Sequence, residues 1–431
     1  MLQLQEDDRL LIIVPHPDDE SLGCGGIIQR AMKMMVPVKV VYLTYGDANE
    51  WSFIKFNKFR LPTLRPKSIK KMGQRRYQEA LNACQKLGLS KKQISFLGYP
   101  DFGTLRIWYK HWGAAKPARG LFTRATSVPY DNAYRPGASF RGDEILHDLK
   151  SILLDFKPTR VFTSHRLDFN ADHQALYLYV RVALWDIKQQ LKPKFHPFLT
   201  HFHTWPQPRG LKPNTSLTPP PILENQLKWI SFELQHHEIA GKLHALNQHV
   251  TQMSATPTYL MAFIRKNELF GDYHTLLTKD MLDEELHQEG AGYLIQQTEE
   301  GQKIADEEEI GLDHHSIIIE DGELVESVHL TRQFHQDAII TFYIFPYSFG
   351  RDFGKEPKYR IKVKRRGIEF KNVEENMDVS QLKLTRNKEN RELTLRFPMK
   401  LLNHADILLI NVRSELRNRM VDWIPWRIIK M

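Results

Sequence analysis

The first 270 residues alternate between short apolar runs and longer segments in which apolar side chains recur every three or four positions. The apolar runs predict strands at 9–15, 38–44, 94–99, 160–164 and 199–205. The periodic segments predict helices at 21–35, 69–88, 142–156, 172–191, 224–250 and 257–269. Strands and helices in this alternation are typical of an α/β fold, a Rossmann-like parallel sheet with helices on both faces.

Beyond residue 312 the helical period disappears, and short alternating segments follow one another with turn residues between them. This pattern predicts a C-terminal all-β domain that is sandwich-like. The chain therefore divides into an α/β domain over 1–275, an acidic connector over 276–312 and an accessory β domain over 313–431. No catalytic cluster is visible in the β domain, which leaves packing, self-association or glycan binding as its role.

Charge is distributed unevenly along the 431 residues, whose net charge is +9. Residues 279–309 hold eleven acids and two lysines, whereas residues 51–76 hold nine lysines or arginines and no acid. The basic segment is either a surface for anionic ligands or a solvated loop. Because no nucleic-acid-binding signature accompanies it, no nucleic-acid partner is expected.

Cysteine content and the N-terminal segment bear on the compartment. Cys24 and Cys84 are the only cysteines, too few for a disulfide framework, and this suits a reducing compartment. The first residues lack the basic region and apolar core of a signal peptide, and no apolar run reaches membrane-spanning length. We expect a cytoplasmic protein without a membrane span.

The first candidate site follows the strand predicted at 9–15, in the run His-Pro-Asp-Asp-Glu at 16–20. In an open parallel sheet, ligands bind outside the carboxyl ends of the strands. Histidine and carboxylate side chains together suit a borderline metal such as zinc, which takes about three protein ligands in a catalytic site. A further carboxylate that is not a ligand can act as the general base.

A second polar cluster follows the strand predicted at 160–164. It contains His165, Asp168, Asn170, Asp172 and His173. Taken singly, each cluster could be a turn or a helix cap. Two such clusters at the same end of one sheet favour a metal site instead.

These motifs resemble those of the zinc-dependent N-acetylglucosaminyl deacetylases, the family named for LmbE and PIG-L. Its hallmarks are an apolar strand followed by His-Pro-Asp-Asp-Glu, here 16–20, and an Asp-His pair that opens a later helix, here 172–173. Supporting matches are LTYGD (43–47), Arg76-x-x-Glu79-Ala80, LGYPD (97–101), HFHTWP (201–206) and FIRKNELF (263–270). The resemblance covers about residues 8–270 and implies an LmbE-like deacetylase domain there.

The resemblance also implies the roles of individual residues. His16, Asp19 and His173 are the implied ligands of a zinc ion, with Fe²⁺ as another candidate metal. Asp18 is the implied general base, which takes a proton from the attacking water and can pass it to the leaving amine. Among the remaining residues, we expect Asp172 to orient His173 and Glu20 to be a supporting carboxylate, and Arg76 and Asp101 match positions that help to hold the sugar.

One position departs from the pattern of several family members, which have a histidine three residues before the metal-binding histidine. Here that position is Asn170, so either its amide stabilises the oxyanion or a nearby histidine, His165 or His203, does so. His201 and His203 alternate on the strand predicted at 199–205, which directs both to one face. His236, His237, His244 and His249 fall on a predicted helix that we expect to be peripheral.

The sequence thus predicts a metal-dependent hydrolase that removes the N-acetyl group from a GlcNAc-type sugar or glycoconjugate. Two alternatives stay open, a deacylase of another amide substrate and a non-catalytic glycan- or nucleic-acid-binding protein on the same fold. The expected partner is an N-acetylated amino sugar, and a homo-oligomer is compatible with the sequence.

Overall fold

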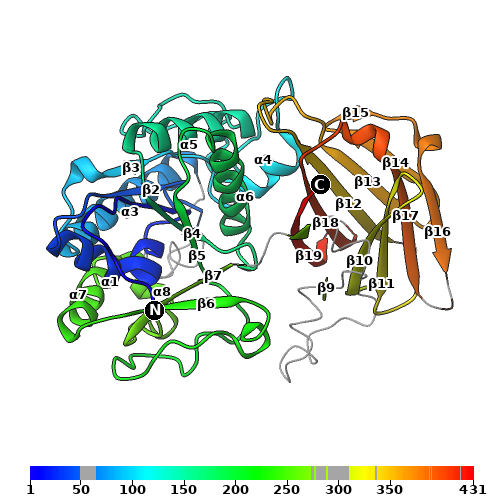
Figure 1. The fold of residues 1–431 in the computed structure, drawn as a ribbon. Helices are drawn as coiled ribbons and strands as arrows, with labels where there is room; N and C mark the ends of the chain where they lie inside the picture. The colour runs from blue at the N-terminus through cyan, green and yellow to red at the C-terminus, as the bar shows by residue number, and fades with distance from the viewer. Residues whose placement is uncertain are drawn as a thin grey trace. The chain divides into compact units, whose positions relative to one another are not determined.

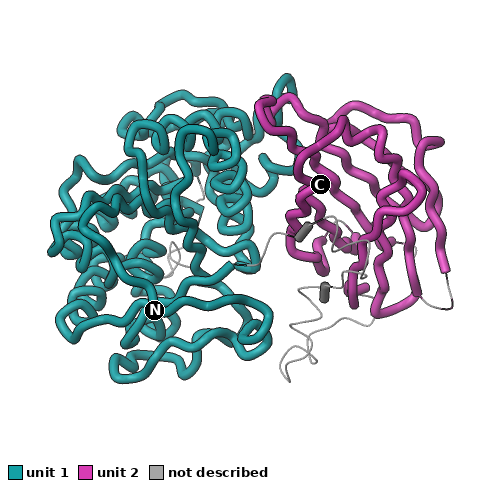
Figure 2. Tube along the Cα trace, in the orientation of Figure 1, with its two compact units in different colours: residues 1–273 teal, residues 274–431 magenta. Residues whose placement is uncertain are grey.

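The computed structural model describes residues 1–48, 65–272, 276–277, 288–289, 310–334, 337–387, 389, 391–417 and 419–431. The chain forms two compact units, residues 1–273 (unit 1) and 274–431 (unit 2), which Figure 2 colours separately. Most of the predicted connector over 276–312 lies outside the described residues. The first part of the basic segment over 51–76 also lies outside them.

A five-stranded parallel sheet forms the centre of unit 1 (Figure 1). Its strands are β1 (Leu10–Val14), β2 (Val38–Tyr42), β3 (Ile94–Phe96), β4 (Arg160–Ser164) and β5 (Lys194–Phe198). They lie in the order β3-β2-β1-β4-β5, and every neighbouring pair is parallel. β1 and β4 are buried along their whole length, as expected for central strands covered on both faces.

Helices cover the two faces of this sheet. They are α1 (Asp19–Lys33), α3 (Pro66–Lys86), α4 (Thr104–Lys110), α5 (Gly142–Phe156) and α6 (Ala171–Asp186). Right-handed crossovers put α1 and α3 on one face and α5 and α6 on the other. α1 approaches the sheet closely because Gly23 has no side chain; a Cβ there would lie 2.2 Å from the ring of Phe198. The predicted α/β fold is confirmed.

The last part of unit 1 differs from the sequence-based prediction. It consists of β6 (Lys228–Glu233), α7 (His236–Leu246), α8 (Val250–Ala255), α9 (Pro257–Met261) and β7 (Asn267–Asp272). The helices predicted at 224–250 and 257–269 were wrong over 228–233 and 267–269, because β6 and β7 pair as antiparallel strands. The strand predicted at 199–205 was also wrong, since the strand that pairs with β4 is β5.

Two antiparallel sheets make up unit 2, one ordered β16-β17-β11-β10-β9 and the other β15-β14-β13-β12-β18-β19-β8. The pairing of β19 with β8 is parallel and the other pairings are antiparallel. The strands are β8 (Leu276–Leu277), β9 (Gln288–Glu289), β10 (Leu312–Glu320), β11 (Glu323–Leu330), β12 (Ala338–Tyr347), β13 (Tyr359–Lys364), β14 (Ile368–Asn372), β15 (Glu375–Asn376), β16 (Lys383–Asn387), β17 (Glu392–Pro398), β18 (Ile407–Leu416) and β19 (Arg419–Lys430).

The core of unit 2 lies between these sheets. Ile340, Phe342 and Ile344 alternate along β12 and belong to the same buried cluster as alternate residues of β17. One apolar face from each sheet is the arrangement of a β-sandwich, so the predicted all-β fold is confirmed. Short 3₁₀ turns complete the two units at Lys91–Gln93, Pro221–Leu223, Val379–Gln381 and Met399–Leu402.

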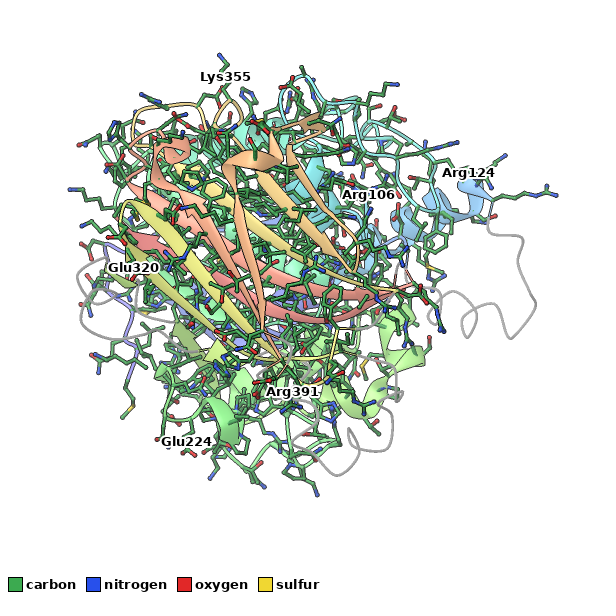
Figure 3. All side chains as sticks on the ribbon, turned by 90° about the vertical axis from the view of Figure 1, so that its right-hand side faces the viewer. Arg106, Arg124, Glu224, Glu320, Lys355 and Arg391 are labelled. Carbon is green, nitrogen blue, oxygen red and sulfur yellow. The ribbon has the colours of Figure 1, made fainter. Side chains whose placement is uncertain are left out.

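Exposed charged side chains project from both units, among them Arg106, Arg124 and Arg391 (Figure 3). Such side chains are ordinary on a protein surface and mark no site by themselves. Within the described ranges, the helices are too short or too polar to cross a bilayer.

Candidate metal and catalytic site

The order in which the chain adds strands to the sheet reverses between β1 and β4, although the two strands are parallel. The chain runs from β1 outward through β2 and β3, then returns to β4 on the opposite side of β1. The carboxyl ends of two such strands are the usual place for a ligand in an open α/β sheet. His16, Asp18 and Asp19 follow β1 at this edge, and His173 lies in the first turn of α6, after β4.

His16, Asp19 and His173 converge on one carboxylate oxygen. His16 Nδ1 lies 3.4 Å and His173 Nε2 lies 3.2 Å from Asp19 Oδ2. The three residues offer ligand atoms that all lie within 4.8 Å of one another. Two ligands of a tetrahedral zinc ion, each about 2.0–2.1 Å from it, lie about 3.4 Å apart. The spacing therefore fits a divalent metal.

The hydrogen bonds of this group also fit a metal. All three residues are buried, and His173 Nε2 faces Asp19 Oδ2 at 3.2 Å without forming a well-aligned hydrogen bond to it or to another described residue. A buried nitrogen that lacks a well-aligned hydrogen bond is costly, and coordination of a cation by this nitrogen and Asp19 would remove that cost. The side chains that the sequence predicts as ligands are thus suited to hold the ion.

Each imidazole is held through its other nitrogen. His16 Nε2 lies 3.1 Å from Asp101 Oδ1 and 3.3 Å from Asp172 Oδ2. His173 Nδ1 lies 3.3 Å from Asp168 Oδ2. The prediction that Asp172 orients His173 was therefore wrong, because Asp172 contacts the other histidine and Asp168 takes the expected place.

Asp172 is turned toward the segment before α4. Its carboxylate accepts hydrogen bonds from the backbone N–H groups of Phe102, at 2.6 Å, and Thr104, at 3.0 Å. Asn170 is the N-cap of α6, and its Oδ1 accepts a hydrogen bond from the backbone N–H of Asp172 at 2.9 Å. The side chain of Asn170 therefore already has a structural task at the start of the helix.

Asp18 lies next to the predicted ligands and faces Arg76, whose Nη2 is 3.6 Å from Asp18 Oδ2. Burial and the negative charge of Asp19 raise the pKa of Asp18 to about 6, although Arg76 opposes the shift. A carboxyl group with a pKa near neutrality can both accept and return a proton. These properties suit the general base that the sequence predicts.

The pKa values of the two histidines are raised, whereas the pKa of Asp19 is lowered. Burial disfavours the charged form of His173, but Asp168 and Asp19 raise its pKa to about 9. The pKa of His16 is also raised well above its usual value, because Asp101 outweighs burial. Burial alone would raise the pKa of Asp19, but His173 and His16 lower it well below its usual value. The site is rich in negative charge that protons or a metal cation can neutralise.

His201 joins the cluster from the segment after β5. Its Nδ1 lies 3.0 Å from Asp168 Oδ1, and its ring centroid lies 4.6 Å from that of His173. Its side chain is 35% exposed, whereas that of His173 is fully buried. His203 was the predicted oxyanion candidate in this region, but the strand at 199–205 on which that prediction rested is not formed. His201 is the histidine that the structure brings to the site.

His165 is fully buried, and its ring contacts residues other than the predicted metal ligands. Its Nδ1 accepts a hydrogen bond from the backbone N–H of Leu167 at 3.1 Å, and its ring stacks on Trp229 at 6.2 Å. Burial lowers the pKa of His165 to about 4, so it is neutral at pH 7. It is a poor candidate for a cationic group at the oxyanion.

Arg76 and Asp101 are buried and form part of the frame of the site. Arg76 donates to the backbone carbonyls of Gly46 and Pro17, both at 2.6 Å. Asp101 Oδ2 accepts a hydrogen bond from the backbone N–H of Ala48 at 2.7 Å. Their contact with a sugar remains a prediction.

His249 lies much closer to the site than the sequence indicates. It is fully buried, and its Nε2 is 2.8 Å from Glu20 Oε1. The expectation of a peripheral helix was wrong for this histidine, which is the N-cap residue of α8. The two residues are 229 positions apart, and no local pattern could have paired them.

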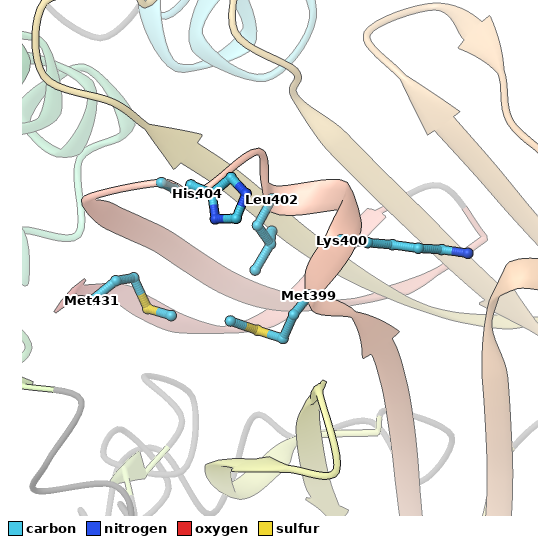
Figure 4. Close-up of a pocket in the computed structure, with 6 residues that line it drawn as sticks. Met399, Lys400, Leu402, His404 and Met431 are labelled. Carbon is cyan, nitrogen blue, oxygen red and sulfur yellow. The ribbon is translucent and has the colours of Figure 1, made fainter.

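Unit 2 contains a pocket of about 400 Å³ (Figure 4). It is lined by Met399, Lys400, Leu402, His404, Ala405 and Met431. The side chains of this lining include one imidazole and one amine, and the others are apolar. The groups that could hold a metal among the described residues all belong to unit 1.

Comparison with known proteins agrees with the geometry of unit 1. Residues 11–184 match the model of the family described as PIG-L, GlcNAc-PI de-N-acetylase. Residues 11–184 are a PIG-L (LmbE-like) family domain. This stretch contains both motifs that the sequence analysis selected and every predicted metal ligand.

Individual relatives match shorter stretches of the chain, and solved structures match longer ones. A probable N-acetyl-alpha-D-glucosaminyl L-malate deacetylase 2 of Bacillus subtilis is 32% identical over 96 residues, which is 22% of this chain. That match covers 38% of the relative's own length. Among solved structures, the A40926 pseudoaglycone deacetylase Dbv21 is similar with a TM-score of 0.39 and 16% identity, over 62% of this chain and 96% of its own. The N,N'-diacetylchitobiose deacetylase from Pyrococcus horikoshii has a TM-score of 0.36 and 20% identity, over 61% and 82%.

Proposed function

We propose that the PIG-L domain is a metal-dependent hydrolase that removes the N-acetyl group from a GlcNAc-type sugar or glycoconjugate. The observation that carries this proposal is the convergence of His16 and His173 on Asp19 beside a second carboxylate, Asp18, with a raised pKa. The family description and the name of the Bacillus subtilis relative support the acetamido sugar as the substrate class.

His16, Asp19 and His173 would hold the ion, with zinc as the proposed metal and Fe²⁺ as the other candidate. A divalent metal bound there supplies Lewis-acid activation of water and of the acetamide carbonyl. Asp18 takes the proton from the attacking water and returns it to the nitrogen of the leaving amine. Arg76 keeps the Asp18 carboxylate in place from the side.

His201 is the proposed contact for the acetamide oxygen or the leaving amine. Asp168 orients its ring through Nδ1, and Nε2 makes no hydrogen bond to the described residues. The 35% exposure of its side chain makes it accessible to a substrate. Asn170 is the weaker candidate because its amide oxygen caps α6.

The test is release of amine from a panel of acetylated amino sugars by purified protein, with and without added zinc. We expect turnover that a chelator abolishes and zinc restores, together with one metal ion per chain by elemental analysis. Turnover that survives complete metal removal would refute the metal-dependent mechanism. Turnover only on other acylated amines would point to a deacylase with a different substrate, and bound metal without any turnover would point to a binding protein.

A further inference from the structure

The backbone of Asp18 is held in an unusual conformation. Its φ is 118°, in a region that residues with a side chain rarely occupy. Such a conformation persists only where the surrounding structure fixes it. The contacts that fix Asp18 therefore bear directly on the position of the proposed base.

Glu20 supplies one of these contacts. Its Oε2 accepts a hydrogen bond from the backbone N–H of Asp18 at 3.0 Å, and its Oε1 accepts one from Ser21 Oγ at 2.6 Å. Oε1 also lies 2.8 Å from His249 Nε2. Glu20 and His249 are both completely buried, so this charge-assisted contact is not weakened by solvent.

The turn that carries His249 is anchored independently of this contact. Thr251 Oγ1 donates to Glu79 Oε2 at 2.6 Å, and Glu79 lies on α3. The same helix carries Arg76, which donates to the carbonyl of Pro17, next to Asp18. Removal of the His249 ring would therefore leave the turn attached while releasing Glu20.

From this geometry we propose that His249 is a positioning residue for Asp18. Through Glu20 it fixes the strained backbone of the base, so that the carboxylate stays in reach of the attacking water. Its ring nitrogen Nε2 contacts Glu20 and not the proposed ligands His16, Asp19 and His173. The inference rests on the proposed hydrolase function, because it assigns a partner to the base of that reaction.

The test uses full-length protein and compares kcat, KM, metal content and thermal unfolding. We expect His249→Ala to lower kcat by about 10–100-fold, since small misplacements of a reacting group cost about this much. KM and the metal content should stay within about twofold of the wild type. His249→Gln, whose amide can still donate to Glu20, should recover most of the loss. Should the alanine variant fail to fold, His249→Gln and Glu20→Gln replace it, and Glu20→Gln should show the same selective loss of kcat.

A matched control separates positioning from general destabilisation. His196 is a buried histidine on β5 whose ring stacks on Phe162, and its side-chain contacts are with Arg160 and Phe270 rather than with Glu20 or Asp18. His196→Ala should lower the unfolding temperature while leaving kcat within about twofold of the wild type. A loss of kcat in this variant equal to that in His249→Ala would overturn the proposal.

A double variant gives the sharpest outcome. If His249 acts through Asp18, adding His249→Ala to Asp18→Asn should not lower the residual turnover further. If the losses of kcat in the two single variants multiply in the double variant, the positioning role of His249 is refuted. A kcat of His249→Ala near the wild-type value would refute it as well. Either result would leave the proposed hydrolase function intact. A wild-type protein that releases no amine from any acylated sugar would refute the proposed function, and this inference with it.

Discussion

Both units bury a histidine against a carboxyl group, but the surroundings differ. In unit 1, His16 lies within 3.4 Å of carboxylate oxygens of Asp19, Asp101 and Asp172. In unit 2, His315 Nε2 lies 3.1 Å from Glu326 Oε2, on neighbouring strands β10 and β11. The first histidine thus faces a surplus of negative charge, and the second has one carboxyl partner among the residues that the structure describes.

The proton affinities follow from this difference. The carboxylates around His16 outweigh burial and raise its pKa, whereas burial and the positive Arg427 lower the pKa of His315 well below its usual value. Burial raises the pKa of Glu326 to about 8, with Arg427 opposing the shift. At pH 7 the pair in unit 2 is neutral and shares a hydrogen bond, which is a structural arrangement. The charged surplus in unit 1 is an arrangement that a metal ion can neutralise.

The largest expected effect separates base from ligand in unit 1. Asp18→Asn should keep one metal per chain and lower turnover by about 10²–10⁴, because it removes proton transfer but no coordination bond. His173→Ala should lose metal affinity as well as turnover. Elemental analysis and amine release measure both quantities on the same samples.

Unit 2 provides the control for that pair of variants. His315→Ala should retain metal and turnover even if it lowers the unfolding temperature, since its partner is a single neutral carboxyl group. An Asp18→Asn protein with near-normal turnover would contradict the role of the base. Metal loss in His315→Ala would contradict the distinction between the two regions.

The next effect concerns His201, which lies outside the two hallmark motifs at 16–20 and 172–173. His201→Ala should lower kcat by about 10²–10³, the usual cost of one oxyanion donor, with little change in KM. Asn170→Ala should mainly lower stability by about 1 kcal/mol, because it removes a helix cap. Measurements of kcat and of thermal unfolding on both variants decide which residue donates to the oxyanion. If Asn170→Ala lost kcat and His201→Ala did not, the oxyanion donor would be Asn170.

The sequence could predict the parts of the site that are local. Residues 16–20 and 172–173 are contiguous motifs, and the parallel order of β1 and β4 brings strand ends to one edge. His201 and His249 could not be predicted, because the contacts that hold them join segments far apart in the chain. Residues 228–233 were wrongly predicted as helix because of a similar distant contact. These residues form a strand through their pairing with β7, which the local sequence does not reveal.

The smallest expected effect tests the neutral pair in unit 2 through the pH dependence of stability. Because burial raises the pKa of Glu326 in the folded protein, its contribution is complete below the pKa of the unfolded chain and is lost as pH rises toward about 8. Between pH 6 and 8 this carboxyl group is already ionised in the unfolded state but is still mostly protonated in the folded state. The free energy of unfolding should therefore fall by up to about 1.4 kcal/mol per pH unit in this window.

Urea denaturation of the full chain at pH 6, 7 and 8 measures this slope. Glu326→Gln cannot titrate, so it should flatten the dependence on pH by the contribution of this one group. Glu323→Gln is the matched control on the same strand, because Lys383 and Arg396 lower the pKa of Glu323 and it stays ionised in both states throughout the window. An equal slope in the wild type and in Glu326→Gln would mean that Glu326 is ionised in the folded protein. The pair with His315 would then carry a negative charge, because the lowered pKa of His315 keeps its ring neutral, and the contrast with the charged cluster of unit 1 would rest on the number of carboxylates alone.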